Sequence, residues 1–428
     1  MNTPVYLHGL RLPAWLEAPR DAAGLTDISI AGGRIAGLLP SALHAPQEAW
    51  QAAGALALPA LVDAHTHLDK TFTRARLGDV PPGLLNAIQA MMRDQSVWTE
   101  TDVRERAGQG LQWAWEAGVG RLRTHCDWRE PTGRVPMAWP VLLELAEQWR
   151  GRIDIDCVNL APLPYYASRD EAWRLARRIA RDADYACLGA FVHTSNWQAD
   201  ALGHLVRAAA DTGLRLDLHV DEELAPEAVG LTTVARLARE TGMQGRIVCG
   251  HACALAAMPR DRALRILDDV ADAGIRLVCL PATNLLLQDA RTGHTPRMRG
   301  LTLVQEARER GIPVLLASDN VQDPFCASGS YDPLDALGLG ALAAQLGDVF
   351  DDWSQAVCRR DWLDAGAGAP LRAGDAADLI VLPSSSRAGF PSRAWPRLVL
   401  RRGVFVSSVS ADMPREAPYP RTPADHIH

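Results

Sequence analysis

Side chains that bind metal ions or transfer protons follow several short apolar runs along this chain. They are His65 and His67 in "DAHTH", His219 and Glu222 in "LDLHVDE", His251 in "GRIVCGH" and Asp319 in "IPVLLASDN". Alternate residues of a β-strand share a face, so His65 and His67 are expected to point the same way. A single histidine at a strand end is ordinarily only hydrogen-bonded, but six such residues on one rim indicate a metal site.

This donor set suits hydrolytic chemistry. Three imidazoles and one carboxylate bind a borderline divalent ion, Zn2+ or Fe2+, with room for a water. Such an ion lowers the pKa of the water from ~15.7 to about 7, which gives hydroxide near neutral pH. Asp319 can bind the metal and accept the proton of the water, and Glu222 and His251 remain as acid–base and orienting groups.

Lys70, three residues after His67, is the only lysine among the Lys and Arg residues of the chain. Lysine carries a compact ammonium on a flexible stem, whereas arginine carries a planar fork. Its position favours an ammonium that reaches a ring carbonyl or enolate oxygen beside the metal. The alternative is a surface lysine without a role.

The elements that must position these residues are eight apolar runs that end near residues 65, 125, 160, 193, 219, 251, 283 and 319. Segments of 3.6-residue periodicity, such as "EAWRLARRIARDA" and "LVRAAADTG", separate most of them. Eight strand–helix units predict a (β/α)8 TIM barrel over residues 59–370, with chemistry at the C-terminal ends of the strands.

The two ends of the chain differ from this pattern. Residues 1–58 include "DISIAGGRIAGLLP", which predicts a hairpin around Gly-Gly. Residues 371–428 contain further short strands, and the two ends together predict a small β-sandwich domain. The Pro-rich tail "MPREAPYPRTPADHIH" is expected to be irregular.

Composition narrows the class of protein. The formal net charge of −7, with no basic stripe, argues against nucleic acid as a partner. Eight scattered cysteines without a C-x-x-C pair, no secretory signal and no apolar run of about 18 residues predict a reduced, soluble, cytoplasmic protein without a membrane segment.

The ordered motifs "VDAHTHLD", "RTHCD", "LDLHVDEE", "VCGHACALAAM" and "GIPVLLASDNVQDPF" resemble the amidohydrolase superfamily, within it the bacterial cytosine deaminase-like branch. The resemblance covers almost the whole chain. It implies one divalent ion on His65, His67, His219 and Asp319. It also implies that Glu222 shuttles a proton to the substrate ring and that His251 holds the attacking hydroxide. Relatives are commonly multimeric, so a homo-oligomer is expected.

Several positions depart from the cytosine deaminase pattern and bear on the substrate. Leu163 stands near the place of a glutamine that reads the pyrimidine, Asn320 replaces an aspartate, and Phe325 replaces a tryptophan. Lys70 gives an H-x-H-x-x-K arrangement similar to that of enzymes that remove alkylamines from hydroxylated s-triazines. These four residues are therefore candidate substrate contacts.

Weaker candidates lie elsewhere on the rim. Asn196 and Trp197, in "HTSNW", would face the substrate ring or pack within their loop. His125 would line the pocket or make a structural hydrogen bond, and Asn284 is expected to buttress the rim.

The favoured function is a hydrolase whose metal-bound hydroxide attacks the amino-bearing carbon of a small N-heterocycle, cytosine or a related amino-pyrimidine or triazine, and releases ammonia. The first alternative is a hydrolase that removes an alkylamine from a hydroxy-s-triazine or opens a cyclic amide. The second is a non-catalytic metal-binding scaffold, which Glu222 and His251 disfavour. The zinc deaminase signature H-x-E…P-C-x-x-C is absent from the sequence, which argues against base editing of polynucleotides.

Overall fold

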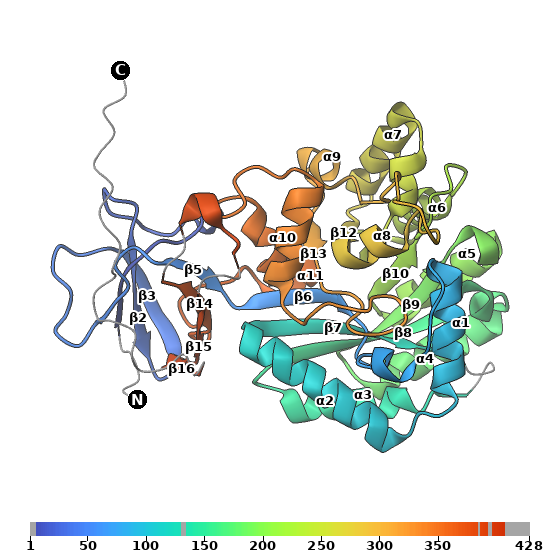
Figure 1. Ribbon diagram of the computed structural model, residues 1–428, viewed down its shortest axis with the longest axis horizontal. Helices are drawn as coiled ribbons and strands as arrows, with labels where there is room; N and C mark the ends of the chain where they lie inside the picture. The colour runs from blue at the N-terminus through green and yellow to red at the C-terminus, as the bar shows by residue number, and fades with distance from the viewer. Residues whose placement is uncertain (1–5, 130–133, 384–385, 393–395, 407–428) are drawn as a thin grey trace. The chain divides into compact units, whose positions relative to one another are not determined.

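The computed structural model describes residues 6–129, 134–383, 386–392 and 396–406, and the expected irregular tail lies outside these residues. The chain divides into two compact units (Figure 1). One consists of residues up to Pro59, Phe350–Asp352 and residues from Leu371 onward. The other consists of Ala60–Val349 and Trp353–Pro370.

The second unit is built on a parallel sheet of eight strands in sequential order. The strands are β6 (Leu61–Thr66), β7 (Val119–Asp127), β8 (Asp154–Pro162), β9 (Ala186–Val192), β10 (Leu216–Val220), β11 (Ile247–His251), β12 (Arg276–Cys279) and β13 (Val314–Leu316). A parallel bridge between Thr66 and Asp319 joins the last strand to the first. The backbone N–H of Asp319 also donates to the carbonyl of His65 at 2.9 Å. The predicted (β/α)8 barrel is confirmed.

Helices connect the strands and cover the outside of the sheet (Figure 1). They are α1 (Leu84–Gln95), α2 (Glu100–Ala117), α3 (Ala138–Trp149), α4 (Arg169–Asp182), α5 (Ala199–Thr212), α6 (Gly230–Thr241), α7 (Arg260–Asp272), α8 (Pro281–Leu287), α9 (Val304–Glu309), α10 (Pro333–Ala343) and α11 (Arg360–Leu363).

Local sequence explains where these helices begin and end. The hydroxyl of Ser168 accepts a hydrogen bond from the backbone of Glu171 and so caps the start of α4. Helix α4 buries only Ala172, Ala176 and Ile179, so its arginine-rich side is a solvated face. Helix α5 ends at Gly213, whose φ of 77° is readily adopted only by glycine.

The first unit contains two four-stranded sheets. Their strands are β1 (Tyr6–Leu10), β2 (Thr26–Ala31), β3 (Arg34–Pro40) and β4 (Trp50–Gln51) in one, and β5 (Leu56–Pro59), β14 (Leu379–Leu382), β15 (Leu398–Arg401) and β16 (Val404–Phe405) in the other. The predicted hairpin is confirmed, since β2 and β3 pair antiparallel around Gly32 and Gly33, both at positive φ. Strand β5 pairs antiparallel with β14, so segments from both ends of the chain share one sheet and one apolar core.

Buried ion pairs fill part of the barrel between β7, β8 and β10. The guanidinium of Arg123, 1% exposed, donates to Asp217 at 2.7 Å and to Asp156 at 2.9 Å. Each charge is thus matched inside the barrel, as burial of an ion requires. This network holds the side chain of Asp217 in β10. Asp217 lies two residues before His219, so the two side chains share one face of the strand.

No helix in the described part of the chain is both long and apolar enough to cross a membrane. All eight cysteines are buried free thiols.

Candidate metal centre and active site

The histidines and carboxylates singled out above lie at the C-terminal ends of the barrel strands. His65 lies on β6, His219 on β10 and His251 ends β11, while Asp319 follows β13 by three residues. All are at least 96% buried. Parallel strands in sequential order bring these ends to one rim, as barrel enzymes require.

Four donor atoms converge closely. His219 Nε2 lies 3.1 Å from His65 Nε2 and 3.3 Å from His67 Nε2. Asp319 Oδ1 lies 3.2 Å from His67 Nε2 and 3.6 Å from His65 Nε2. Metal–ligand bonds of ~2.0–2.2 Å place neighbouring donors about 3.0–3.6 Å apart in four- or five-coordinate geometry. The separations therefore fit one divalent ion bound by all four residues.

The electrostatics of the cluster favour a ligand role. Burial and the neighbouring imidazoles lower the pKa of His65 and His219 well below the usual value, and burial with Lys70 does the same for His67. Neutral imidazoles keep a lone pair for a metal. Among the described residues, neither oxygen of Asp319 has a hydrogen-bond partner. A buried carboxylate in that state is costly unless something binds it.

The backbone around the cluster is adapted to close packing. At Gly250 a Cβ atom would lie 3.0 Å from Cε1 of His65, so any other residue there would require the ring to shift by a few tenths of an ångström. His251 and Asp319 have φ values of 69° and 59°, in the left-handed region that costs a non-glycine residue on the order of 1–3 kcal/mol. Such strain at the ends of two strands of one rim is typical of functional sites.

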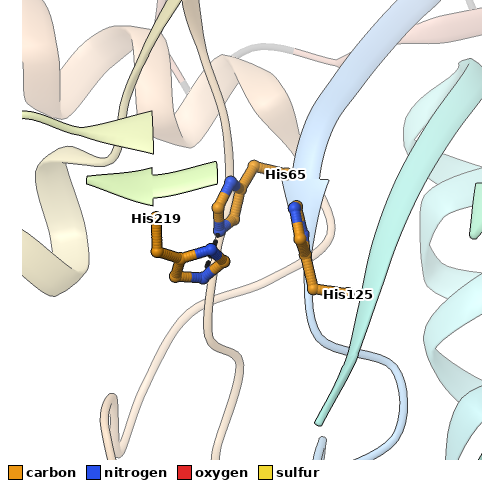
Figure 2. A group of neighbouring side chains, drawn as sticks. All are labelled: His65, His125 and His219. Carbon is orange, nitrogen blue, oxygen red and sulfur yellow. Dashed lines mark hydrogen bonds between the residues drawn. The ribbon is translucent and has the colours of Figure 1, made fainter. Parts of the chain in front are cut away.

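His125 on β7 lies beside the cluster but is held elsewhere. Figure 2 shows its ring grouped with those of His65 and His219, and its centroid is 4.0 Å from that of His65. Its Nε2 lies 3.0 Å from Asp217 Oδ1 and its Nδ1 lies 3.4 Å from the carbonyl oxygen of Thr66. Both ring nitrogens are occupied, so His125 supports the ring of His65 instead of offering a ligand.

Glu222 and His251 stand together beside the four donors. His251 Nδ1 lies 3.1 Å from Asn284 Oδ1 and 3.5 Å from Glu222 Oε1, while Nε2 of His251 has no partner among the described residues. Burial, reinforced by the Asp319 carboxylate, raises the pKa of Glu222 well above its usual value. A carboxyl group with a raised pKa can both accept and donate a proton near neutral pH. Asn284 buttresses His251, as expected.

Lys70 is buried, with 3% of its side chain exposed. Its Nζ donates to Asp127 Oδ2 at 2.8 Å and lies 4.5 Å from the centre of the Phe325 ring. Burial alone would lower the pKa of Lys70, but the carboxylates of Asp127, Asp69 and Asp323 outweigh it and raise the pKa. A surface lysine is thus excluded, and the side chain carries a charged ammonium in the site.

A cavity beside the donors collects most of these residues. His67, Lys70, His219, Glu222, His251, Asn320 and Phe325 line it. Asn320 Nδ2 also donates to Asp323 Oδ2 at 2.6 Å, which fixes the amide beside the cavity. Two of the candidate substrate residues, Asn320 and Phe325, therefore stand with Lys70 at the same cavity.

Three other candidates do not line this cavity. Leu163, fully buried in the 3-10 turn Leu163–Tyr166, packs into the core. The side chain of Asn196 caps its own turn, accepting from the backbone of His193 and donating to the carbonyl of Phe191. Trp197 directly follows that turn. The turns after β8 and β9 thus hold the side chains of Leu163 and Asn196 in contacts outside the cavity.

Sequence reasoning did not identify several cavity residues. Asp127 and Arg129 follow His125 at intervals of two, and Phe191 precedes His193 by two, so strand alternation is the signal that would have indicated them. Leu84 and Ile88 on α1 also line the cavity and pack with Phe325. Their helical pattern resembles that of any core helix, so the sequence carries no signal for them.

The chain is similar to proteins of known activity. A model of the amidohydrolase family matches residues 142–406. A pterin deaminase of Rhizobium rhizogenes strain K84 is 34% identical over 387 residues, covering 89% of this chain and 87% of the relative. The N-isopropylammelide isopropyl amidohydrolase of Pseudomonas sp. strain ADP is 25% identical, covering 72% of this chain and 73% of that protein.

The fold has a close counterpart among solved structures. The 5-methylcytosine deaminase from Klebsiella pneumoniae, liganded with phosphonocytosine, superposes with a TM-score of 0.80 at 24% identity over 94% of this chain and 98% of that one. The family match and the relative at 34% identity confirm the resemblance drawn from the strand-end motifs. The chain belongs to the amidohydrolase family.

Proposed function

We propose that this protein hydrolyses the bond between a ring carbon and an exocyclic amino group on an N-heterocycle of the amino-pyrimidine class, releasing ammonia. One observation carries the proposal: three imidazole nitrogens and a carboxylate oxygen converge within 3.1–3.6 Å. They do so beside Glu222 and His251, at a cavity that Lys70 also lines. A scaffold that only held a metal would not need the last three groups.

The donor set implies one divalent ion, Zn2+ or Fe2+, on His65, His67, His219 and Asp319. Such an ion, when bound, supplies a water of lowered pKa and polarises it for attack. In this proposal the buried carboxyl of Glu222 carries a proton to a ring nitrogen and then to the departing amine. His251, fixed by Asn284, presents Nε2 to the same space and orients the nucleophile.

Lys70 is proposed to stabilise negative charge that develops on a ring oxygen. Its ammonium has three N–H groups, and Asp127 accepts one of them. Because the side chain is buried, a second N–H donated to substrate acts where water is excluded, where such donors are most effective.

A fused ring such as a pterin is the favoured substrate. The most informative relative in sequence is a pterin deaminase at 34% identity over most of both chains. Phe325 and Phe191 line the cavity and give aromatic, apolar contact to a flat ring.

A second candidate is removal of an alkylamine from a hydroxy-s-triazine, supported by the relative at 25% identity that bears this activity in its name and by the H-x-H-x-x-K arrangement. Hydrolysis of a cyclic amide is a more distant alternative. Both leave the roles of Glu222 and His251 unchanged, and they differ in the leaving group.

The test measures the released amine. The purified protein is supplied with Zn2+ or Fe2+ and incubated with pterin, cytosine, 5-methylcytosine, isocytosine, ammelide and N-isopropylammelide. We expect ammonia from pterin at the highest kcat/KM. Isopropylamine from N-isopropylammelide alone would favour the second candidate, and no amine from any compound would refute both. Light scattering on the same sample tests the expected homo-oligomer.

A further inference from the structure

Arg129 is a cation at the active-site cavity with few partners. It lines the cavity together with Lys70 and Asp127. Its Nε is buried and has no hydrogen-bond partner among the described residues. Its guanidinium lies 3.9 Å from Asp127 Oδ1, beyond hydrogen-bond distance. About a fifth of its side chain, 21%, remains exposed.

Arg123 and Arg106, two buried arginines of the barrel, make more contacts than Arg129, although Nε of Arg106 also has no partner among the described residues. Arg123 binds two carboxylates, and Arg106 donates to two backbone carbonyls and to Asp102. Asp127, the carboxylate nearest Arg129, already accepts from Lys70 at 2.8 Å. A guanidinium that loses water without gaining acceptors is costly, so the donors of Arg129 are available for a ligand.

The geometry of the guanidinium defines the ligand. Asp127, Asp69 and Asp323 surround the ammonium of Lys70, whereas Arg129 meets Asp127 only at 3.9 Å, and Asp127 already accepts from Lys70. The planar fork of arginine matches the two oxygens of a carboxylate. Leu160, Pro162 and Phe191 line the same cavity and give apolar contact for a flat ring.

We propose that Arg129 is a specificity residue that binds a carboxylate substituent on the ring of the substrate, so that the preferred substrate is a carboxylated amino-heterocycle. This inference rests on the proposed function for the identity of the ring. It adds a second point of recognition, separate from the metal donors and from Lys70.

The experiment compares matched pairs of ligands. Values of kcat/KM are measured for pterin and for a pterin with a carboxylate on its pyrazine ring. Equilibrium binding of the two corresponding deaminated products is followed by their fluorescence, which requires no turnover. Both are measured with wild type, Arg129→Met and Arg129→Lys. Arg134→Met is the matched control, because Arg134 is an exposed arginine of the same segment that lines a different cleft.

Wild type and Arg134→Met are expected to prefer the carboxylated member of each pair. Arg129→Met should reduce that preference roughly 10- to 100-fold, the effect of losing a charge-assisted hydrogen bond, and Arg129→Lys should reduce it less. Equal preference in wild type and Arg129→Met, or none in wild type, would overturn the inference. If wild type prefers the carboxylated product in binding yet releases no ammonia, the proposed function fails while the carboxylate site stands.

Discussion

Replacement of Lys70 is expected to lower both the stability of the protein and its catalytic rate. Lys70→Met keeps the length of the stem and removes the ammonium, which leaves the carboxylate of Asp127, 1% exposed, without its hydrogen bond at 2.8 Å. Breaking a buried ion pair by removing one partner costs about 3–5 kcal/mol of stability. The barrel unit has about 300 residues, so this corresponds to a fall in Tm of roughly 5–8 °C.

The catalytic effect is separate from this loss of stability. Removing a buried donor that stabilises transition-state charge costs roughly 2–4 kcal/mol, or about 30- to 900-fold in kcat/KM. Lys70→Arg keeps the charge but places a wider, planar head between Asp127 and the Phe325 ring, so it should impair turnover less than Met does. Bound metal should be unchanged in both variants.

The double variant Lys70→Met/Asp127→Asn separates the two effects. Removing both charges together should restore most of the lost stability, because neither partner is left as an unpaired buried ion. Turnover should stay low, because the ammonium is still missing. Recovery of kcat/KM along with Tm would refute the reasoning and show that Lys70 serves only to neutralise Asp127.

The remaining predictions concern the proton carrier, the metal and Asp27 in the first unit. Glu222→Gln should retain metal yet lose on the order of 10²–10⁴-fold in turnover, and near-normal turnover would mean that the proton takes another route. His219→Ala should lose most of the roughly one equivalent of metal measured in wild type by elemental analysis, whereas two equivalents in wild type would contradict a mononuclear site. Burial raises the pKa of Asp27, but hydrogen bonds from the backbone of Ala42 and Gly9 outweigh it and lower the pKa from 3.8 to about 2. Stability from a carboxylate with a lowered pKa is complete above its unfolded pKa and is lost as the pH falls toward 2, so the Tm deficit of Asp27→Asn should be largest at neutral pH and shrink between pH 4 and 2.

The barrel and the residues of its rim could be predicted from two periodic patterns in the sequence. Apolar runs of strand length alternating with 3.6-residue patterns indicated all eight strands. The polar residues that interrupt those runs at their C-terminal ends are the ones that the fold brings together. His219 and Asp319 are far from His65 and His67 in sequence, and the parallel strands in sequential order bring all four to one rim, within bonding reach of one ion.

The substrate side of the cavity was harder to predict, for a physical reason. Several residues expected to line it lie in short turns. A turn has no repeating pattern, so the sequence does not show which of its side chains face the cavity. Leu163 enters a 3-10 turn and is buried in the core, while Asn196 caps its own turn. Asp127 and Arg129, in contrast, continue the alternation of β7 past His125. Asp127, the ion-pair partner of Lys70, is 57 residues away in sequence and lies on the neighbouring strand β7.

The most direct test of a metal-dependent hydrolase is a titration of the metal-free protein. The protein is stripped with a chelator and titrated with Zn2+ or Fe2+ while ammonia release from the best amino-heterocycle is recorded. Release should be absent without metal and rise in proportion to added ion, reaching a plateau at one ion per chain. Ammonia release that persists at full rate in the stripped protein would contradict the account.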